Sequence, residues 1–303
     1  MAVAFKRPSA LVTGSTDGIG VTTAKNLAAK GYNVIVHGRD EDRIRSACQT
    51  VRNFARDWTE GDGISVYSVK ADLSTIDGTE SLASQVKSLC REHNLNLSVL
   101  MNNAGVYSED RVITPDGLEL TFAVNVVSPF ILTSRLLPVL MQQPKSRIVT
   151  ASSISQSRFI GNWNDLDYTK RPYSAHAAYS ESKLFDAMLT AEFAERLQKA
   201  GLGTDRITCN CLDPGTVNTK MLYAGWGPIG IDVESALDQT WLCTDEEVEN
   251  TTGKYFMSRT ESWSQYDEKQ RLRMWDLLSK LSPDSAAQWE LDVLTCTSVE
   301  ATR

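Results

Sequence analysis

The chain has 303 residues, of which 42% are hydrophobic and 23% charged, and its formal net charge is −7. This length can bury a large core, and the composition is typical of a soluble globular protein. The acidic balance argues against a broad nucleic-acid surface, because phosphate binding needs clustered Lys and Arg. No apolar run approaches the roughly 20 residues that span a bilayer, and the first residues lack the pattern of a secretory signal. We therefore expect a cytoplasmic protein with no membrane span.

The cysteines and histidines give no indication of a metal centre. Only Cys209 and Cys211 are close in the sequence, and alternate positions of a strand place both side chains on one face. We interpret them as small buried residues of a reduced protein, with a metal site as the minor alternative. The three histidines are widely spaced and form no ligand cluster, so no metal is expected.

Short apolar segments alternate with helical patterns from the first predicted strand, 10–12, to the sixth. The other strands are predicted at 33–37, 64–70, 97–101, 147–151 and 206–212. Helices are predicted at 21–30, 41–56, 79–92, 118–140 (with interruptions near Pro129 and Pro138) and 176–200. Alternation of this kind predicts an α/β protein with a parallel sheet that is covered by helices on both faces.

The pattern weakens after Pro214. Segment 220–232 contains three glycines and a proline, which is the composition of a mobile loop. A short strand is predicted at 253–257, followed by a helix at 267–281 with an inward stripe of Leu272, Trp275, Leu278 and Leu281. The tail from residue 282 is weakly helical. Because no linker divides the chain, we predict one domain over 1–303, with a substrate loop or lid at 217–250.

A glycine motif follows the first predicted strand and precedes the first helix. Three glycines allow the backbone to turn sharply and to approach a pyrophosphate at the helix N-terminus. The spacing Gly-x-x-x-Gly-x-Gly is not the commoner one, and in isolation a purely structural turn explains it equally well. Its place between strand and helix favours a dinucleotide site formed by Gly14, Ser15, Asp17, Gly18, Ile19 and Gly20.

The end of the second predicted strand bears on which nucleotide binds. NAD-binding proteins of this type place an acid there to hold the ribose hydroxyl, whereas this chain has Gly38 followed by Arg39. A guanidinium can hold a 2′-phosphate with paired hydrogen bonds, which favours NADP(H). The alternative is a solvated loop arginine, and the acids Asp40 and Glu41 next to it weaken the argument.

Polar residues follow the third, fourth and fifth strands. Asp72, next to Leu73, can accept a hydrogen bond from an adenine amino group, although a turn or cap aspartate fits equally well. Asn103, Ala104 and Gly105 belong to the string Asn-Asn-Ala-Gly, whose small and amide residues suit a backbone that passes close to a ligand.

Tyr179 and Lys183 are four residues apart, so they share one face of a helix. A tyrosine hydroxyl has a pKa of about 10, and a nearby ammonium lowers it toward the range in which proton transfer is efficient. Ser153 ends the fifth strand, at the sheet edge where ligands bind, and can donate to a substrate carbonyl. Taken alone, the Tyr–Lys pair is more often two surface residues.

In this order the motifs resemble those of the short-chain dehydrogenase/reductase family over about Ala10 to Met257. The family's TGxxxGIG, NNAG, YxxxK and PG motifs match Thr13–Gly20, 102–105, 179–183 and Pro214–Gly215. The resemblance implies a doubly wound Rossmann fold, with Tyr179 as proton donor, Lys183 on the nicotinamide ribose and Ser153 on the carbonyl. It also implies a water held by Asn125, cofactor binding by Pro214 and Gly215, and contacts with the nicotinamide carboxamide from Thr216, Val217 and Thr219.

Gly38-Arg39-Asp40 and the segment around Tyr255 are most similar to retinol-dehydrogenase-like and carbonyl-reductase-like members. We therefore expect an NADPH-dependent reductase of ketones or aldehydes, reversible as an alcohol dehydrogenase. An enone C=C reductase and a catalytically silent nucleotide-binding protein are the alternatives. Phe159, Trp163, Tyr223 and Trp226 indicate either an apolar or aromatic substrate or lid residues that pack on one another. Both a monomer and a homo-oligomer fit the sequence.

Overall fold

The computed structural model describes residues 7–58 and 63–300, which are organised around an eight-stranded sheet. The strand order is β3-β2-β1-β4-β5-β6-β7-β8. Neighbouring strands are parallel, except that β7 and β8 pair antiparallel. The strands are β1 (Pro8–Val12), β2 (Asn33–Gly38), β3 (Val66–Lys70), β4 (Asn96–Asn102), β5 (Ser146–Ala151), β6 (Ile207–Asp213), β7 (Tyr255–Met257) and β8 (Thr260–Ser262).

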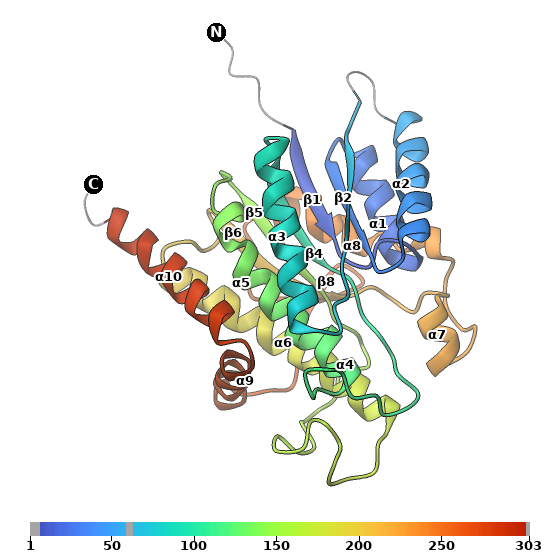
Figure 1. The fold of residues 1–303 in the computed structure, drawn as a ribbon, viewed down its shortest axis with the longest axis vertical. Helices are drawn as coiled ribbons and strands as arrows, with labels where there is room; N and C mark the ends of the chain where they lie inside the picture. Colours follow the sequence, from blue (N-terminus) through green and yellow to red (C-terminus); the bar gives the residue numbers. More distant parts are fainter. Residues whose placement is uncertain (1–6, 59–62, 301–303) are drawn as a thin grey trace.

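Helices cover both faces of the sheet (Figure 1). One face carries α1 (Gly18–Ala29), α2 (Glu41–Arg56) and α8 (Asp238–Thr244), and the other carries α3 (Ile76–Glu92), α5 (Ser128–Leu140) and α6 (Ala175–Lys199). Outside these layers, α9 (Glu268–Leu281) packs on α6 and α10 (Pro283–Glu300) packs on α5. The short elements are α4 (Leu120–Phe122), α7 (Lys220–Gly225) and the 3-10 turns Val233–Ser235 and Glu246–Val248. The predicted doubly wound parallel sheet is confirmed.

Helix capping accounts for the main differences at the predicted boundaries. α1 begins at Gly18, three residues earlier than predicted, because the Asp17 carboxylate caps it by accepting from the Gly18 N–H. α3 likewise begins at Ile76 instead of 79, since the Thr75 hydroxyl accepts from the Gly78 N–H. In contrast, β3 begins two residues later than predicted. The elements α7, α8 and β8 were not predicted, because each is short and lies after residue 214.

The predicted helix 118–140 differs in its interior. The chain forms a π-helical turn at Ala123–Val127 that runs directly into α5, and Pro129 in the first turn of α5 has no N–H to donate to the preceding turn. The predicted interruption at Pro138 is wrong, because this proline lies inside α5. Contrary to our expectation for the sequence, Leu120–Leu140 is long and apolar enough to cross a membrane, with a hydropathy of 1.5. In the fold it is 89% buried inside the protein, as a core helix is.

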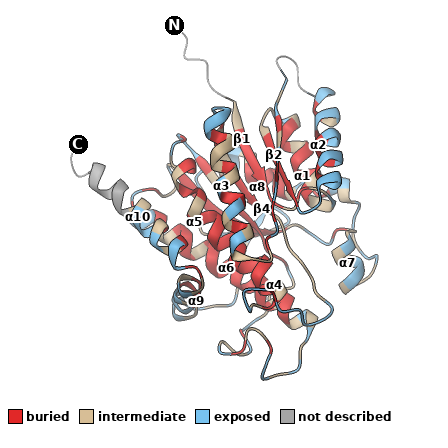
Figure 2. Cartoon of the chain, in the orientation of Figure 1, coloured by how far each residue is buried: buried red, intermediate tan, exposed pale blue. Residues whose placement is uncertain are grey.

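Two apolar cores flank the sheet, and Figure 2 shows the buried residues concentrated along the strands and the inner helix faces. The larger core extends to the C-terminal helices, where rings of Phe193, Trp275 and Trp289 pack together. The predicted stripe of α9 is partly wrong. Leu272 is 42% exposed, whereas Met274 is fully buried beside Trp275 and Leu278. Trp289, which is fully buried, explains why the tail docks as a regular helix.

Candidate active site

A pocket of about 380 Å³ lies at the carboxyl edge of the sheet, where β1, β2, β4 and β5 end. This is the edge at which doubly wound folds bind nucleotides. Residues predicted from separate parts of the sequence line it together: Gly14, Asp17, Gly18, Ile19, Gly20, Arg39, Asp72, Leu73, Asn103, Ala104, Gly105, Tyr179, Lys183, Pro214 and Thr219.

The glycine loop between β1 and α1 is built for close backbone approach. A Cβ on Gly20 would lie 2.4 Å from the Gly14 oxygen and 2.5 Å from the Asn103 Nδ2. Gly14 adopts a φ of +63°, which favours glycine. The Asn103 amide donates to the oxygens of Thr13 and Gly14, at 2.8 and 3.3 Å. The two motifs therefore fix each other across β1 and β4.

Three predicted cofactor residues lie outside the pocket lining. Ser15 is fully buried, and its hydroxyl donates to the Val12 oxygen and accepts from the His37 N–H. Val217 is 3% exposed, and Gly215 is likewise absent from the lining. Ser15 therefore shapes the loop from beneath.

The predicted 2′-phosphate end of the pocket contains a second arginine that sequence reasoning missed. Arg39 is exposed and lines the pocket, and so does Arg43 from the first turn of α2. The Asp17 carboxylate binds both Arg43, at 3.0 Å, and Lys220 of α7, at 2.6 Å. Lys220 and Arg43 hold the pKa of Asp17 below its usual value against the opposing effect of burial. Asp72 also lines the pocket, and its carboxylate accepts from the Ser74 N–H.

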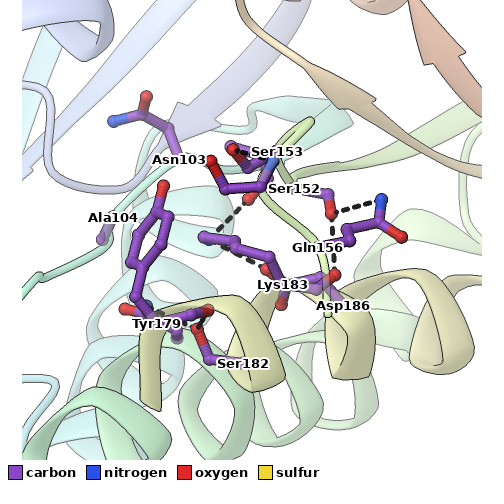
Figure 3. A network of polar contacts seen from close by, with 12 residues as sticks. Asn103, Ala104, Ser152, Ser153, Gln156, Tyr179, Ser182, Lys183 and Asp186 are labelled. Carbon is purple, nitrogen blue, oxygen red and sulfur yellow. Dashed lines mark hydrogen bonds and ion pairs between the residues drawn. The ribbon is translucent and has the colours of Figure 1, made fainter. Parts of the chain in front are cut away.

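At the nicotinamide end, Tyr179 and Lys183 project from α6 (Figure 3). Both are buried, with exposures of 7% and 4%, and the Lys183 Nζ lies 5.6 Å from the centroid of the tyrosine ring. The Ser153 hydroxyl lies close enough to Tyr179 to act on the pKa of its hydroxyl. This brings together the three residues that the sequence predicted for proton transfer and carbonyl binding.

The electrostatics of Tyr179 differ in their net effect from the sequence expectation. Burial raises the pKa of its hydroxyl, while the Lys183 ammonium and the neighbouring Ser153 hydroxyl lower it. The pKa is raised overall, because the loss of hydration exceeds these two effects. Lys183 thus acts in the predicted direction but does not alone bring the phenol into the neutral range.

Asn125 lies in the π-helical turn and is 1% exposed. Its side chain accepts from the Val106 N–H at 2.8 Å and donates to the Val106 oxygen and the Ser182 hydroxyl. The residue predicted to hold a water therefore fixes the backbone that follows Gly105 against α6. Neither Asn125 nor Ser153 lines the pocket.

Aromatic rings enclose Tyr179 on its outer side. The rings of Tyr107 and Trp226 lie 5.9 and 5.5 Å from that of Tyr179, and the Tyr107 hydroxyl hydrogen-bonds His176 at 2.8 Å. Of the other aromatic residues named from the sequence, Trp163 packs on Phe185 in the core, while Phe159 and Tyr223 are 64% and 52% exposed. Trp226 is therefore the one of these four that contacts Tyr179.

The predicted substrate loop 217–250 contains two different kinds of structure. Residues 217–231 form the segment with α7, closed by a bridge between Val217 and Ile231. In α8, by contrast, Trp241, Leu242 and Cys243 are buried against the sheet. Gln239 of α8 links the Thr23 hydroxyl to the Asn103 side chain. This helix therefore holds Thr23 of α1 and Asn103 in place next to the cofactor pocket.

Comparison with known proteins agrees with this geometry. Residues 8–225 match the family model described as short chain dehydrogenase. The chain belongs to the short-chain dehydrogenase family. Retinol dehydrogenase 13 of Homo sapiens is 31% identical over 284 residues, covering 88% of this chain and 81% of the relative. Polyprenol dehydrogenase of Mus musculus is 30% identical over 286 residues, covering 88% and 81%. The predicted resemblance to retinol-dehydrogenase-like members of this short-chain dehydrogenase family is thus confirmed.

Solved structures show the same fold. A crystal structure of an uncharacterised protein from Mycobacterium paratuberculosis superposes on this short-chain dehydrogenase with a TM-score of 0.72 at 25% identity, covering 91% of this chain and 94% of that one. The landomycin C-6 ketoreductase LanV, solved with bound NADP and rabelomycin, gives a TM-score of 0.61 at 24% identity, covering 83% and 96%.

The residues present fit the nicotinamide cofactor that this family implies. Gly14, Gly18 and Gly20 line the pocket at the start of α1, where a helix N-terminus can hold a pyrophosphate. The pocket then continues without interruption from Arg39 to Tyr179 and Lys183. Within the described residues there is no group of three or more His, Cys, Asp and Glu side chains that could hold a metal ion.

Proposed function

We propose that this short-chain dehydrogenase reduces a ketone or aldehyde to an alcohol with NADPH, in a reversible reaction. The observation that carries the proposal is that Tyr179 and Lys183 line one end of the nucleotide pocket, with Ser153 beside Tyr179. The cofactor, when bound, supplies the hydride. Ser153 donates to the carbonyl oxygen, and Tyr179 gives that oxygen its proton as negative charge develops on it.

The preference for NADP(H) over NAD(H) is supported by the two arginines at the other end. Arg39 and Arg43 present guanidinium groups where the family places the ribose 2′-oxygen, and the end of β2 carries no acid. Solved proteins of the same fold, among them the ketoreductase LanV, contain bound NADP. A bound 2′-phosphate would compete with Asp17 for Arg43.

The substrate that this site supports is an apolar carbonyl compound or its alcohol. The relatives named above act, by their names, on retinol and polyprenol, which are long apolar alcohols. Here the rings of Tyr107 and Trp226 form an apolar wall beside Tyr179. We place the lid of this site in residues 217–231, because Trp226 follows α7 and contacts the catalytic tyrosine.

The test is a comparison of the wild-type enzyme with Tyr179→Phe on a panel of ketones, aldehydes and secondary alcohols. The variant should lose at least ~100-fold in kcat, as general acid catalysis contributes that much, while NADPH affinity stays within about threefold. Mass and NMR analysis of the product must show reduction at C=O. An intact variant activity would refute the mechanism, and a product reduced at C=C would favour an enone reductase.

A further inference from the structure

A buried carboxylate lies directly behind the active-site lysine. Asp186 is three residues beyond Lys183 on α6, and its Oδ2 accepts a hydrogen bond from the Lys183 Nζ at 2.9 Å. The Asp186 side chain is fully buried, and its second oxygen, Oδ1, has no hydrogen-bond partner in the described structure. Figure 3 shows Lys183 between Tyr179 on one side and Asp186 on the other.

The lysine ammonium has three N–H groups, and the protein engages two of them. One donates to Asp186 and a second donates to the backbone oxygen of Ala151, at 2.8 Å. The third is left for the pocket that Lys183 lines. Two fixed acceptors therefore determine the direction in which the remaining N–H points.

The charged groups around this pair are few. Besides Lys183, the groups that act on Asp186 or Lys183 electrostatically are Tyr179 on α6 and Cys211 on β6, while Asp213 on β6 acts on Tyr179. Burial would favour a neutral Lys183, but Asp186 and Tyr179 reverse this and raise the pKa of the ammonium. Burial raises the pKa of Asp186 to about 6, against the opposing effect of Lys183.

We propose that Asp186 is a positioning residue of the reaction, which holds the Lys183 ammonium in place and keeps it charged inside the closed site. This inference rests on the proposed function, because it assigns a partner to the lysine of that same site. An isolated buried ammonium is costly and loses its proton. The carboxylate offsets that cost and leaves one N–H free for the reacting groups.

The proposal has a pH signature. Above about pH 6 Asp186 is ionised and supports Lys183, whereas below it the carboxyl is protonated and the wild-type site resembles an Asn variant. In Asp186→Asn two effects act on carbonyl reduction at alkaline pH. Lys183 loses its proton at a lower pH, and, wherever Lys183 stays charged, loss of the Asp186 charge lowers the pKa of Tyr179. As pH rises, both effects reduce the population of the enzyme in which Lys183 is charged and Tyr179 is protonated.

The experiment compares the pH profiles of kcat/KM for the wild-type enzyme and Asp186→Asn. The alkaline limb of the profile should begin at least about one pH unit lower in the variant than in the wild type, and the two profiles should coincide below about pH 6. Glu192→Gln is the matched control. Glu192 is a buried carboxylate of the same helix that pairs with Arg196 and Arg271, away from the pocket. It should leave the shape of the profile unchanged.

A second readout does not depend on turnover. The ¹³C-NMR shift of the Lys183 Cε, assigned with a Lys183→Arg variant, reports the charge of the amine. In Asp186→Asn its pKa should fall by at least about one unit. An unchanged lysine pKa, or a loss of activity that is uniform across pH, would overturn the proposal. If Tyr179→Phe is inactive and Asp186→Asn is unaffected, the proposed function stands and this inference fails.

Discussion

The imidazole Nδ1 of His37 accepts a hydrogen bond from the backbone N–H of Gly14, at 3.0 Å. Its Nε2 lies 3.2 Å from the Ala71 oxygen, so the ring donates there and joins the ends of β2 and β3 to the glycine loop. This pattern requires the neutral ring, because a protonated Nδ1 cannot accept. Burial accordingly lowers the pKa of His37 to about 4.

His37 should make the stability of the protein depend on pH. Because its folded pKa lies below the unfolded value of 6.5, its stabilising effect is present above about pH 6.5 and is lost as pH falls toward 4. Between about pH 7.5 and pH 5, the wild-type free energy of unfolding should fall by about 2 kcal/mol more than that of His37→Asn. Urea denaturation measures both. His93→Asn, at an exposed site, is the control and should show the full wild-type decrease.

A methyl group at Gly20 should disrupt the phosphate cradle. The added Cβ would meet the Gly14 oxygen at 2.4 Å and the Asn103 Nδ2 at 2.5 Å, so the loop must move. We expect Gly20→Ala to weaken NADPH binding by at least ~10-fold, as a charged hydrogen bond contributes about 1.5–3 kcal/mol. Fluorescence titration with NADPH measures the affinity. Gly63→Ala, where no atom lies within 4 Å of the added Cβ, should bind normally. Normal NADPH binding by Gly20→Ala would contradict the prediction, because it would show that the loop can move without loss of affinity.

The two arginines of the pocket should select the nucleotide. Arg39→Ala and Arg43→Ala should each weaken NADPH binding by ~10- to 100-fold and leave NADH binding nearly unchanged, because only NADPH carries the 2′-phosphate. Arg45→Ala is the matched control, since this residue of α2 is exposed and pairs only with Asp42 among the salt bridges found. Equal affinity of the wild-type enzyme for the two cofactors would refute the argument.

The periodic part of the chain could be predicted well from the sequence. The strands from β1 to β6 each contain buried apolar residues at the predicted positions, and the buried stripe of α2 is formed, as expected, by Ile44, Ala47, Cys48 and Val51. The segment after Pro214 resisted prediction for a physical reason. α8 is only seven residues long, and β8 is an exposed edge strand of three residues. Such short elements owe their structure to tertiary packing more than to local pattern.

The site residues that belong to a sequence motif were predicted. Those that reach the site only through tertiary contacts were missed. Tyr179, Lys183 and the glycines stand at recognisable spacings. His37 contacts the glycine loop at Gly14, and Gln239 contacts Asn103, in each case from another element, and no spacing within their own segments indicates this. Asp186 is different, because its position three residues after Lys183 places both side chains on one helix face. That signal was present in the sequence, but a lone acid in a helix is usually exposed.

The Lys183–Asp186 pair should reduce stability while serving the reaction. A buried ion pair can be replaced by apolar residues of similar volume with a neutral effect or a gain of about 1–4 kcal/mol. We therefore expect the double variant Lys183→Met with Asp186→Leu to be inactive and at least as stable as the wild type in urea. Lys183→Met alone should lose about 3–5 kcal/mol at alkaline pH, because it leaves Asp186 ionised and unpaired.

The single variant also fixes the sign of the pH effect. An unpaired buried carboxyl has a folded pKa above its unfolded value, so the folded state holds the extra proton and stability decreases as pH rises. The loss of unfolding free energy in Lys183→Met, relative to the wild type, should therefore become smaller as pH falls from about 8 to 5. The double variant should show no such change. A double variant that is several kcal/mol less stable than the wild type would contradict this prediction. It would show that the ion pair stabilises the fold more than apolar residues of similar volume do.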